Sequence, residues 1–374
     1  MRIGFDAKRF FHNTRGLGNY SRDAVRVLSS FYPDNQYILF NPKPRHRISV
    51  DLPPNVTEVT PTSFFGKKIP SLWRSRGMCR DMDTRKIDIF HGLSQELPWG
   101  IERTNAKSVV TFHDAIFIRY PELYATSYRK IFTLKNRYAC RVADRIIAIS
   151  EQSKRDAIEF FNADEKKISV VYQGCNAIFR KKTSQEEIMA VRNTYHLPKS
   201  FLLNVGAIEK RKNAKLIVEA LYRQSLDISL VVVGAPTDYL DEVRETVHRY
   251  GMENQVVFLH HVSTADLPAL YAASEAFVYP SVFEGFGIPV LEALCVGTPV
   301  ITSRGSCFEE TAGNAALYID PYNADELGEA IHRVLTDEDC RQRMIAEGKR
   351  HAENFTDYRI ADELMKVYKS LNGI

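Results

Sequence analysis

The sequence lacks several features that would place it in a specialised class of protein. Its six cysteines are scattered and form no C-x-x-C pair, which argues against a zinc site and a disulfide framework. No apolar run approaches the roughly 20 residues that a membrane-spanning helix needs. Charged residues interrupt the start, MRIGFDAKRFFHN, so we expect no signal peptide. Together these absences favour a reducing, cytoplasmic setting.

The chain also lacks a strong charge of either sign. Lys and Arg exceed Asp and Glu by four, a formal net charge of +4 over 374 residues. A nucleic-acid-binding protein would cluster far more basic residues, so we expect no nucleic-acid partner. There is no low-complexity tract, and 44% of the residues are hydrophobic. At this length two globular domains are expected rather than one core.

Short apolar runs alternate with longer helical patterns along almost the whole chain. Runs that are apolar throughout are typical of parallel strands buried on both faces. Their alternation with helices predicts an α/β fold of two Rossmann-like, doubly wound domains that face each other across a cleft. The predicted strands are RIGFDA at 2–7, QYILFN at 36–41, VVTFH at 109–113, RIIAIS at 145–150, ISVVY at 168–172, FLLNVG at 201–206, SLVVVG at 229–234, QVVFLH at 255–260, AFVYPS at 276–281, PVITS at 299–303 and ALYID at 316–320.

The polar stretch that begins at Gln173 is the best candidate for a linker. It follows a predicted strand and precedes a helix that leads into a second α/β unit. We therefore place the first domain at residues 1–173 and the second at 174–357. The last amphipathic helix, at 358–374, would pack either on the second domain or back on the first, and its pattern does not decide between them.

The sequence FEGFGIPVLEALCVGTPVITS, residues 283–303, combines two carboxylates with a glycine-rich bend. Pro289 suits the first turn of a helix, and Gly297 suits its end. The bend would direct free N–H groups and the positive end of the helix dipole toward an anionic ligand. Glu284 would follow a strand, and Glu292, on the first helical turn, would accept hydrogen bonds from a diol such as ribose. In the alternative interpretation, Glu292 only complements the dipole and Glu284 is solvated.

The residues E-G-F-G-I-P-V-L-E-A, followed by G-T-P-V-I, resemble the signature of the retaining glycosyltransferases of family four, which have the GT-B fold. The resemblance extends over nearly the entire chain. It implies that the bend and both glutamates hold a nucleoside-diphosphate sugar, with Glu284 at the sugar and Glu292 at the ribose. Close approach of the bend and backbone contacts to the sugar and phosphates are implied for Gly285, Phe286, Gly287, Ile288 and Val290.

A basic loop follows the predicted strand that ends at Gly206, in NVGAIEKRKNAKLIVEAL. Arg211 and Lys212 in this loop can neutralise a diphosphate leaving group, although a K-R-K run is more often a solvated turn. The loop is similar to the G…R-K-N segment of the family, which favours the diphosphate role. Some relatives carry an arginine directly after the glycine, where this chain has Ala207. The leaving-group charge would then rest on Lys212 with Arg211, or on loop amides alone.

His113 and Asp114 end a predicted strand in VVTFHDAIFIRYPELY. A histidine there can bind a sugar hydroxyl, whereas the His-Asp pair taken alone can also cap the next segment. The family places a histidine here against the donor sugar, so the resemblance implies a catalytic role for His113 and a place for Asp114 in the substrate site. His91 also ends a strand, and we expect a structural or acceptor-side role for it.

Further site residues follow from the ends of other predicted elements. Gly16 and Gly18 open a helix in RGLGNYSRDAVRVL, and the equivalent loop of the family closes over the diphosphate and the acceptor. The strand ends at 234–236 and 260–262 would flank a nucleobase, which places His261 in the donor site. His260 and His261 would point to opposite sides and have no acidic partner at ligand spacing, so we expect no metal site.

The segment at residues 64–86 carries seven basic and two acidic residues, net +5, interleaved with Phe64, Phe65 and Trp73. Basic charge with aromatic anchors suits contact with an anionic membrane or a lipid-diphosphate acceptor, although a solvated face is the simpler alternative. The D-x-D sequence at residues 81–83 matches the metal signature of the other large glycosyltransferase fold. It does not end an apolar strand, so we interpret it as coincidence.

The resemblance implies an enzyme that moves a hexosyl unit from a GDP- or UDP-linked sugar to a saccharide or lipid-linked acceptor in surface polysaccharide synthesis. It implies retention at the anomeric carbon and no metal or other cofactor. The T-F-H-D-A-I-F region favours mannosyl transfer. We expect a cytoplasmic protein, with a peripheral position at the inner face of the membrane as a further hypothesis. Two alternatives share the architecture: a nucleotide-sugar epimerase and a non-catalytic nucleotide-sugar-binding subunit.

Overall fold

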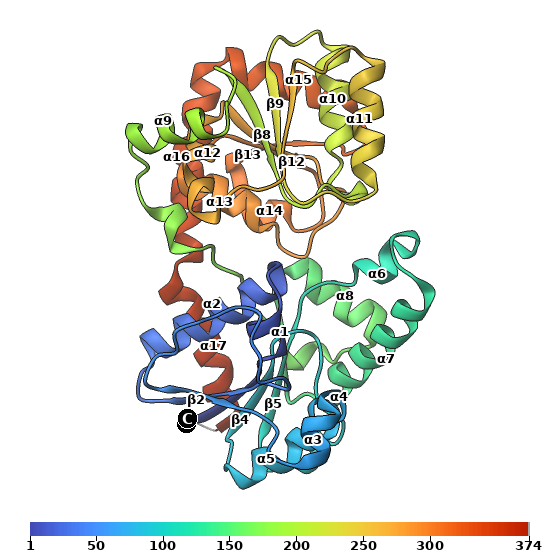
Figure 1. Ribbon diagram of the computed structural model, residues 1–374, viewed down its shortest axis with the longest axis vertical. Helices are drawn as coiled ribbons and strands as arrows, with labels where there is room; N and C mark the ends of the chain where they lie inside the picture. Colours follow the sequence, from blue (N-terminus) through green and yellow to red (C-terminus); the bar gives the residue numbers. More distant parts are fainter. Residues whose placement is uncertain (373–374) are drawn as a thin grey trace. The chain divides into compact units, whose positions relative to one another are not determined.

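The computed structural model describes residues 1–372, with the side chains of Phe65 and Asn372 outside the description. The last two residues of the predicted C-terminal helix therefore lie outside the described residues. The chain divides into two compact units, the first made of Met1–Gly174 together with the chain from Thr356 onward, and the second of Cys175–Phe355 (Figure 1). The polar stretch predicted as a linker begins beside this division.

The first unit is built on a seven-stranded parallel sheet in the order β3-β2-β1-β4-β5-β6-β7. The strand order changes direction between β1 and β4, and ligands of open α/β sheets bind beyond the carboxyl ends of strands at such a switch point. The strands are β1 Arg2–Asp6, β2 Gln36–Phe40, β3 Val56–Val59, β4 Ile89–Gly92, β5 Lys107–Phe112, β6 Arg145–Ala148 and β7 Ile168–Val170.

The second unit has a six-stranded parallel sheet in the order β10-β9-β8-β11-β12-β13, with its switch point between β8 and β11. All residues of β8, β11 and β12 are buried, as their apolar runs predict for central strands. The strands are β8 Phe201–Val205, β9 Ser229–Val233, β10 Val256–Leu259, β11 Ala276–Tyr279, β12 Val300–Ser303 and β13 Ala316–Ile319.

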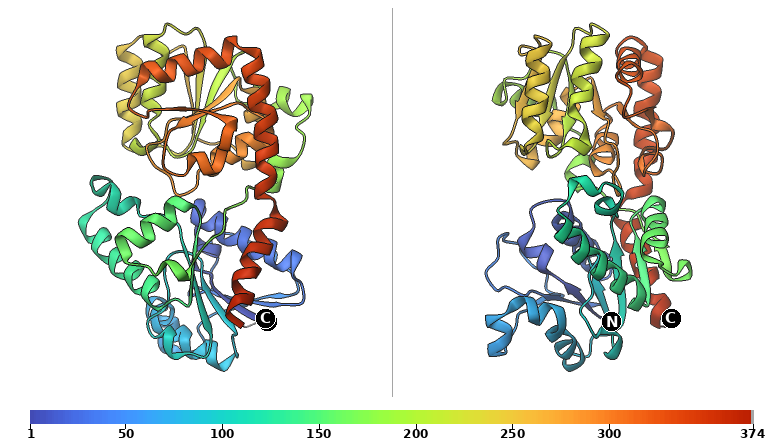
Figure 2. Two further views of the ribbon diagram at one scale, coloured as in Figure 1. Left: turned by 180° about the vertical axis from the view of Figure 1, so that it is seen from behind. Right: turned by 90° about the vertical axis from the view of Figure 1, so that its right-hand side faces the viewer.

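Helices cover both faces of each sheet (Figures 1 and 2). The helices of the first unit are α1 Lys8–His12, α2 Gly16–Phe31, α3 Phe64–Lys68, α4 Pro70–Leu72, α5 Met78–Thr84, α6 Ile116–Arg119, α7 Thr126–Val142, α8 Glu151–Phe161 and α17 Asp357–Asn372, with a π-helical turn at Trp73–Gly77. Those of the second unit are α9 Gln185–Thr194, α10 Ala214–Arg223, α11 Tyr239–Arg249, α12 Leu267–Ala273, α13 Ile288–Val296, α14 Phe308–Ala312, α15 Ala324–Thr336 and α16 Glu338–Ala352.

The structure resolves the question that the sequence left open for the last helix, because α17 belongs to the first unit and packs against α2. Arg26 on α2 forms an ion pair with Asp357 at 2.7 Å. The hydroxyl of Tyr32 donates to Asp362 at 3.0 Å. Tyr368 on α17 is fully buried. The chain thus returns to complete the core of the unit in which it began.

Each of the eleven runs predicted as strands overlaps a strand of the structure, with ends that differ by up to two residues. Strand β3 does not follow from the sequence, because its residues Thr57 and Glu58 are polar. It pairs only with β2 at the edge of the sheet and needs no continuous apolar run. None of the described helices combines the length and apolar composition that crossing a membrane requires.

Candidate active site

Basic and acidic residues follow the two strands that flank the switch point of the second sheet. Arg211 and Lys212 lie on a 3-10 turn between β8 and α10. Glu284 lies in the loop between β11 and α13. A hydrogen bond from the Val282 N–H to the Arg211 carbonyl, 2.8 Å long, joins the two loops. The fold therefore brings Glu284 next to the loop of Arg211 and Lys212, which lie more than 70 positions earlier in the sequence.

The carboxylate of Glu284 is fixed by several donors and is largely buried, with 14% of its side chain exposed. It accepts hydrogen bonds from the hydroxyls of Tyr279 at 2.6 Å and Ser281 at 3.1 Å, and Arg211 lies 2.5 Å away. Burial acts to raise the pKa of Glu284, but the charges of Arg211 and Lys212 outweigh it and hold the pKa below its ordinary value. The site thus presents a fixed carboxylate that is ionised at neutral pH.

The guanidinium of Arg211 is used mainly within the protein. Besides the pair with Glu284, it contacts Glu209 at 2.6 Å and donates to the carbonyl of Phe283. Its side chain is 12% exposed. A planar guanidinium has five N–H donors in a fixed fork, so it can hold two carboxylates and a carbonyl at once in a defined geometry. Arg211 therefore positions Glu284 and its loop, and direct contact with a diphosphate stays a prediction.

Lys212 differs from its neighbour because its ammonium has no carboxylate or hydrogen-bond acceptor among the described residues. The side chain is half-buried, and Nζ lies 6.0 Å from the centre of the Tyr279 ring. It also lies against Gly206, where an added Cβ would come within 2.3 Å of Nζ. Gly206, directly after β8, therefore makes room for a cation that forms no ion pair or hydrogen bond among the described residues, as an anionic ligand site requires.

The glycine-rich bend leads into α13 as the sequence predicts. Gly287 is the N-cap in a left-handed conformation with φ of +88°, and the helix ends at Gly297. The backbone N–H groups of Gly287 and Ile288 have no acceptor among the described residues. The Val290 N–H already donates to the Gly287 carbonyl at 2.9 Å, and the Val290 side chain is fully buried. The positive end of the helix therefore offers two amides to an anion.

The neighbouring bend residues are held in place by packing. Phe286 is 2% exposed and meets the ring of Phe355, while its carbonyl accepts a hydrogen bond from Thr311. Gly285 follows Glu284, whose N–H and carbonyl are both bonded to the hydroxyl of Ser306. These contacts fix the backbone of the bend before any ligand arrives.

Glu292 lies on the second turn of α13, which corrects the prediction that it lies on the first. The first turn of this helix contains no acidic residue, because Ile288 rather than Pro289 is its first residue. The hydroxyl of Tyr271 donates to Glu292 at 3.0 Å, and the side chain of Glu292 is half-buried. Burial first, and then the Glu292 charge, raise the pKa of Tyr271 well above its ordinary value, so this hydroxyl stays a donor. A ribose contact at Glu292 stays a prediction.

The two adjacent histidines after β10 have different surroundings. The Nδ1 of His260 lies 3.0 Å from the carbonyl of Gly234, which directly follows the neighbouring strand β9. His261 is exposed. This arrangement places His260 at the carboxyl end of the sheet and leaves the predicted contact of His261 with a nucleobase a prediction.

In the first unit, His113 follows β5 and is 4% exposed. Its Nε2 lies 2.8 Å from the carbonyl of Leu93, and the ring of Tyr20 meets it edge-on at 4.7 Å. Burial lowers the pKa of His113 to about 4, so the ring is neutral at pH 7. Because Nε2 must carry the proton to bond a carbonyl, Nδ1 has a lone pair that can accept a hydrogen bond from a sugar hydroxyl.

Asp114 begins the loop after His113, and the Ile116 N–H donates to its carboxylate at 3.1 Å. The carbonyl of Asp114 accepts a hydrogen bond from Gln95 at 2.6 Å. The N-cap of the next helix, α6, is Ala115, so Asp114 lies one residue before the cap and its carboxylate accepts from the first helical N–H. The predicted substrate contact of Asp114 stays a prediction.

Gly16 and Gly18 lie at the start of α2 and serve different purposes. A Cβ on Gly16 would meet nothing within 4 Å, whereas a Cβ on Gly18 would lie 1.8 Å from the carbonyl oxygen of Asn13. Gly18 is therefore required for the close approach of the chain that enters α2. Their predicted contact with diphosphate and acceptor stays a prediction.

His91 lies at the centre of a buried hydrogen-bond chain, which gives it a structural role. Its Nε2 lies 2.8 Å from the hydroxyl of Thr111, which in turn lies 2.9 Å from the hydroxyl of Tyr20. Its Nδ1 lies 2.7 Å from the hydroxyl of Tyr368 on α17. Burial, reinforced by nearby His113, lowers the pKa of His91 to about 3.

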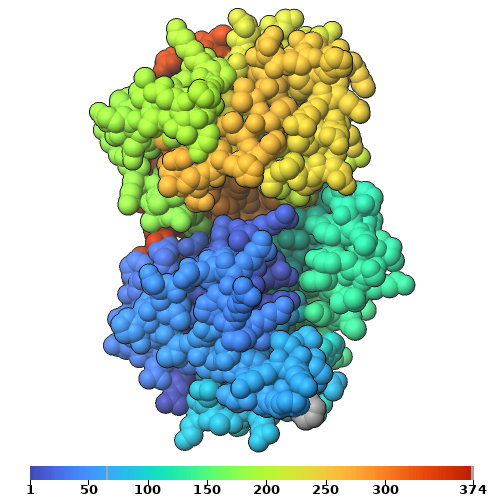
Figure 3. All heavy atoms as spheres, in the orientation of Figure 1, coloured from blue at the N-terminus to red at the C-terminus, as the bar shows by residue number. Residues whose placement is uncertain are grey.

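The structure corrects part of the prediction for the basic segment at 64–86, which lies on the surface of the first unit (Figure 3). Trp73 is 5% exposed and packs in the core, so it is not a surface anchor. Arg74 is also removed from the surface, because it pairs with Asp6 and Glu96. Phe64 is 65% exposed with Lys68 over its ring, and the side chain of Phe65 lies outside the described residues. Membrane contact stays a prediction.

The D-x-D residues lie on α5 and have structural partners. Asp81 accepts a hydrogen bond from the indole of Trp73 at 2.7 Å, and Asp83 accepts one from the Asn105 N–H at 3.0 Å. In the part of the chain that the structure describes, no group of three or more His, Cys, Asp or Glu residues could hold a metal ion.

The residues that hold Glu284 were missed by the sequence analysis. Tyr279, Ser281 and Glu209 each bond to Glu284 or Arg211. A signal for two of them was present, because Tyr279 and Ser281 end the predicted strand AFVYPS at the same sheet edge as Glu284. The donor-side residues of the second unit thus form one cluster, while His113, Asp114, Gly16 and Gly18 belong to the first unit.

Comparison with known proteins agrees with this geometry. Residues 15–177 match the family described as Glycosyltransferase Family 4, and residues 185–351 match the family described as Glycosyl transferases group 1. The chain is 29% identical over 391 residues to O-antigen chain mannosyltransferase B of Escherichia coli, with 99% of this chain and 100% of the relative covered. It is 31% identical over 226 residues to O-antigen chain mannosyltransferase RfbU of Salmonella typhimurium, with 60% of each chain covered.

Solved structures with the same fold cover the whole chain. A sucrose-phosphate synthase from Thermosynechococcus elongatus has a TM-score of 0.81 at 18% identity, covering 100% of this chain and 99% of its own. Anabaena HepE in complex with UDP-glucose has a TM-score of 0.75 at 19% identity, with both chains covered completely. The predicted α/β fold with two Rossmann-like domains is confirmed.

Proposed function

The chain belongs to glycosyltransferase family 4 and has the GT-B fold, and on this premise we propose that it transfers a mannosyl unit from a nucleoside-diphosphate sugar to a saccharide or lipid-linked acceptor. The observation that carries the proposal is the cluster at the switch point of the second sheet, where Lys212, Glu284 and the start of α13 lie together. The choice of mannose rests on mannosyltransferases among the relatives, including the two described above.

In the proposed reaction the diphosphate of the donor binds at Lys212 and at the amides of Gly287 and Ile288. A free ammonium and two helix-start amides stabilise the charge that develops as the sugar leaves. Because these groups supply fixed positive charge, the proposed reaction requires no metal ion or other cofactor.

Glu284 accepts hydrogen bonds from hydroxyls of the donor sugar, and the position of its carboxylate is set by Arg211, Tyr279 and Ser281. A carboxylate that is already oriented does not have to reorganise when the transition state forms. Retention at the anomeric carbon follows if the acceptor attacks from the face that the diphosphate leaves. The leaving diphosphate then takes the proton of the acceptor hydroxyl.

A transfer assay tests this proposal. The protein is incubated with GDP-mannose or UDP-glucose and octyl α-D-mannopyranoside, and the product linkage is determined by NMR. We expect a mannosylated glycoside with an α linkage from GDP-α-mannose, and loss of most activity in Glu284→Gln. Turnover of the nucleotide sugar to an isomerised or free sugar, at an equal rate without acceptor, would favour an epimerase or hydrolase. A β-linked product would contradict retention.

A further inference from the structure

The first unit has a pocket of about 270 Å³ that the proposed donor chemistry does not use. It lies at the switch point of the first sheet, where Asp6 ends β1 and Glu96 follows β4 by four residues. Pro42 and Lys43, which follow β2 by two and three residues, also line it. A pocket at this place in an open parallel sheet is where a ligand is expected.

The charges that line the pocket are not balanced. Its lining contains four cations and two carboxylates, which leaves an excess of two positive charges. Arg74 contacts Asp6 at 2.6 Å and Glu96 at 2.8 Å, and Lys135 donates to Glu96 at 2.9 Å. The two carboxylates are therefore neutralised within the protein by Arg74 and Lys135.

The ammonium groups of the two remaining cations, Lys8 and Lys43, form no ion pair among the described residues, although the backbone N–H of Lys8 donates to the Asp6 carboxylate at 3.1 Å. Lys8 is half-buried at the start of α1, and Lys43 is exposed. Burial first, and then the charge of Arg74, lower the pKa of Lys8. An ammonium that is partly desolvated and repelled by a neighbouring cation is stabilised when an anion binds beside it.

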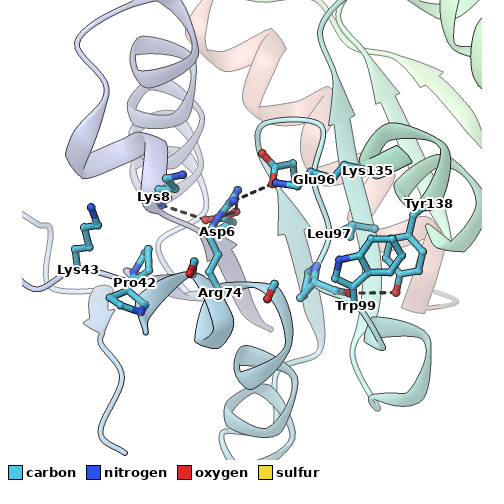
Figure 4. Close-up of a pocket in the computed structure, with 14 residues that line it drawn as sticks. Asp6, Lys8, Pro42, Lys43, Arg74, Glu96, Leu97, Trp99, Lys135 and Tyr138 are labelled. Carbon is cyan, nitrogen blue, oxygen red and sulfur yellow. Dashed lines mark hydrogen bonds and ion pairs between the residues drawn. The ribbon is translucent and has the colours of Figure 1, made fainter. Parts of the chain in front are cut away.

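The opposite wall of the pocket is aromatic. Trp99 is half-buried and packs on Tyr138, with 4.0 Å between the ring centres and 34° between the planes. Figure 4 shows Lys8 and Lys43 on one side of the pocket and the two aromatic rings on the other, with Arg74 and its carboxylates between them. Aromatic faces next to charged groups suit a sugar ring that carries an anionic substituent.

We propose that this pocket binds a phosphorylated saccharide, with its phosphate at Lys8 and Lys43 and its pyranose ring against Trp99. The ionic network of Arg74 fixes the floor of the pocket, because each of its carboxylates has a cation partner. That such a ligand serves as the acceptor rests on the proposed function, whereas its binding does not. A free sugar phosphate and a lipid-linked glycosyl diphosphate share this chemistry.

Binding is tested on the full chain by fluorescence titration with α-D-mannose 1-phosphate. Of the two tryptophans, Trp73 is buried in the core and Trp99 lines the pocket, so a ligand here changes the emission of Trp99. GDP and UDP are kept in excess so that a phosphate site at Lys212 is already filled. We expect saturable binding that is weakened about tenfold or more in both Lys8→Gln and Lys43→Gln, the typical effect of losing a hydrogen bond to a charged group.

Lys166→Gln is the matched control, because Lys166 is an exposed lysine of the same unit that does not line the pocket and lies outside the basic segment at 64–86. Its affinity is expected to equal that of the wild type, and methyl α-D-mannoside and inorganic phosphate are each expected to bind more weakly than the sugar phosphate. Equal affinity in all variants, inorganic phosphate binding as tightly as the sugar phosphate, or no saturable signal would each overturn the proposal. Arg74 is left intact, because its loss would leave the buried carboxylate of Asp6 without a cation partner and Glu96 with Lys135 alone.

A synthetic mannosyl diphosphate ester with a decyl chain identifies the source of the ligand. Lysine-dependent binding of either compound supports the proposal, and tighter binding of the ester assigns the pocket to a lipid-linked saccharide. Calorimetric titration of the same preparation with GDP and UDP separates the two proposals. Lysine-dependent binding of the sugar phosphate without nucleotide binding supports the proposed pocket. It counts only against the proposed donor site in the second unit.

Discussion

At the scale of single residues, the main feature is the division of labour between Arg211 and Lys212. They are adjacent in sequence, but Arg211 is bonded to Glu284, Glu209 and a backbone carbonyl, whereas the ammonium of Lys212 has no such partner among the described residues. The sequence assigned both to a diphosphate. The structure gives Arg211 a positioning role, because a largely buried carboxylate requires a partner of opposite charge.

A double-mutant cycle tests the pair of Arg211 and Glu284. Arg211→Met leaves Glu284 without its main counter-charge, so we expect a loss of about 3 kcal/mol in the free energy of unfolding. Glu284→Gln in addition is expected to recover part of this loss. Denaturation by urea, followed by circular dichroism because both tryptophans lie in the first unit, measures these values.

Arg223→Met is the control for this cycle, because Arg223 pairs with Asp325 at 3.0 Å on the surface, with both side chains about half exposed. Its loss is expected to cost less than about 1 kcal/mol. Strictly additive effects of Arg211→Met and Glu284→Gln would show that the two residues do not depend on each other.

At the scale of elements, the last helix shows how a distant segment completes a unit. Tyr368 on α17 contacts His91 at the end of β4, and through Thr111 the chain of hydrogen bonds reaches Tyr20 on α2. All four residues are buried, so each hydroxyl needs its partner within the protein. The helix is therefore held to the sheet by polar bonds as well as by apolar packing.

Removal of one hydroxyl tests this bond. Tyr368→Phe leaves the ring nitrogen of His91 unpaired and is expected to lower the free energy of unfolding of the first unit by about 1–3 kcal/mol. Urea denaturation followed by tryptophan fluorescence reports on this unit. Tyr358→Phe on the same helix is the control, because Tyr358 is 58% exposed. Equal effects of the two substitutions would contradict the buried role.

The pH dependence of the same measurement follows from His91, whose pKa is lowered to about 3 from an ordinary value of 6.5. Below pH 6.5 the unfolded chain takes up a proton that the folded chain does not, so stability is expected to fall as the pH drops toward 3. Above pH 6.5 the ring is neutral in both states, so His91 contributes no pH dependence to the stability there.

Whether a helix or strand can be predicted from the sequence depends on whether the residues that stabilise it are near or distant in the chain. Central strands such as β8 and β11 are recognisable because both faces are buried and every residue is apolar or nearly so. The bend at Gly287 and the helix end at Gly297 follow from local backbone chemistry. The position of α17 does not follow from local sequence, because its apolar stripe fits either unit. Only its contacts with α2 assign it to the first unit.

The candidate site was predictable to a similar extent. Glu284, Lys212 and the bend are visible as motifs at strand ends, and family membership is confirmed by the comparisons. The burial of Arg74 was not predictable, because its partner Asp6 is 68 residues away in the sequence. A basic residue in a basic segment is read as a surface residue until the carboxylate that it pairs with is known.

At the scale of the whole molecule, each unit places charged residues at the switch point of its own parallel sheet. In the second unit these residues are suited to a nucleoside diphosphate, and in the first they line a pocket with an excess of positive charge. The two sets have different chemistry, since the first has an aromatic wall and the second has a helix start. A transferase needs two such sites, one for the donor and one for the acceptor.

The most direct test of donor binding is calorimetric titration of Lys212→Gln and Lys210→Gln with GDP and UDP. The two lysines lie on the same turn, but Lys210 is exposed, whereas Lys212 is half-buried against Gly206. For the nucleotide that the wild type binds more tightly, we expect an affinity loss of about tenfold or more in Lys212→Gln and no loss in Lys210→Gln. Equal affinities of wild type and Lys212→Gln would contradict a diphosphate site at this turn.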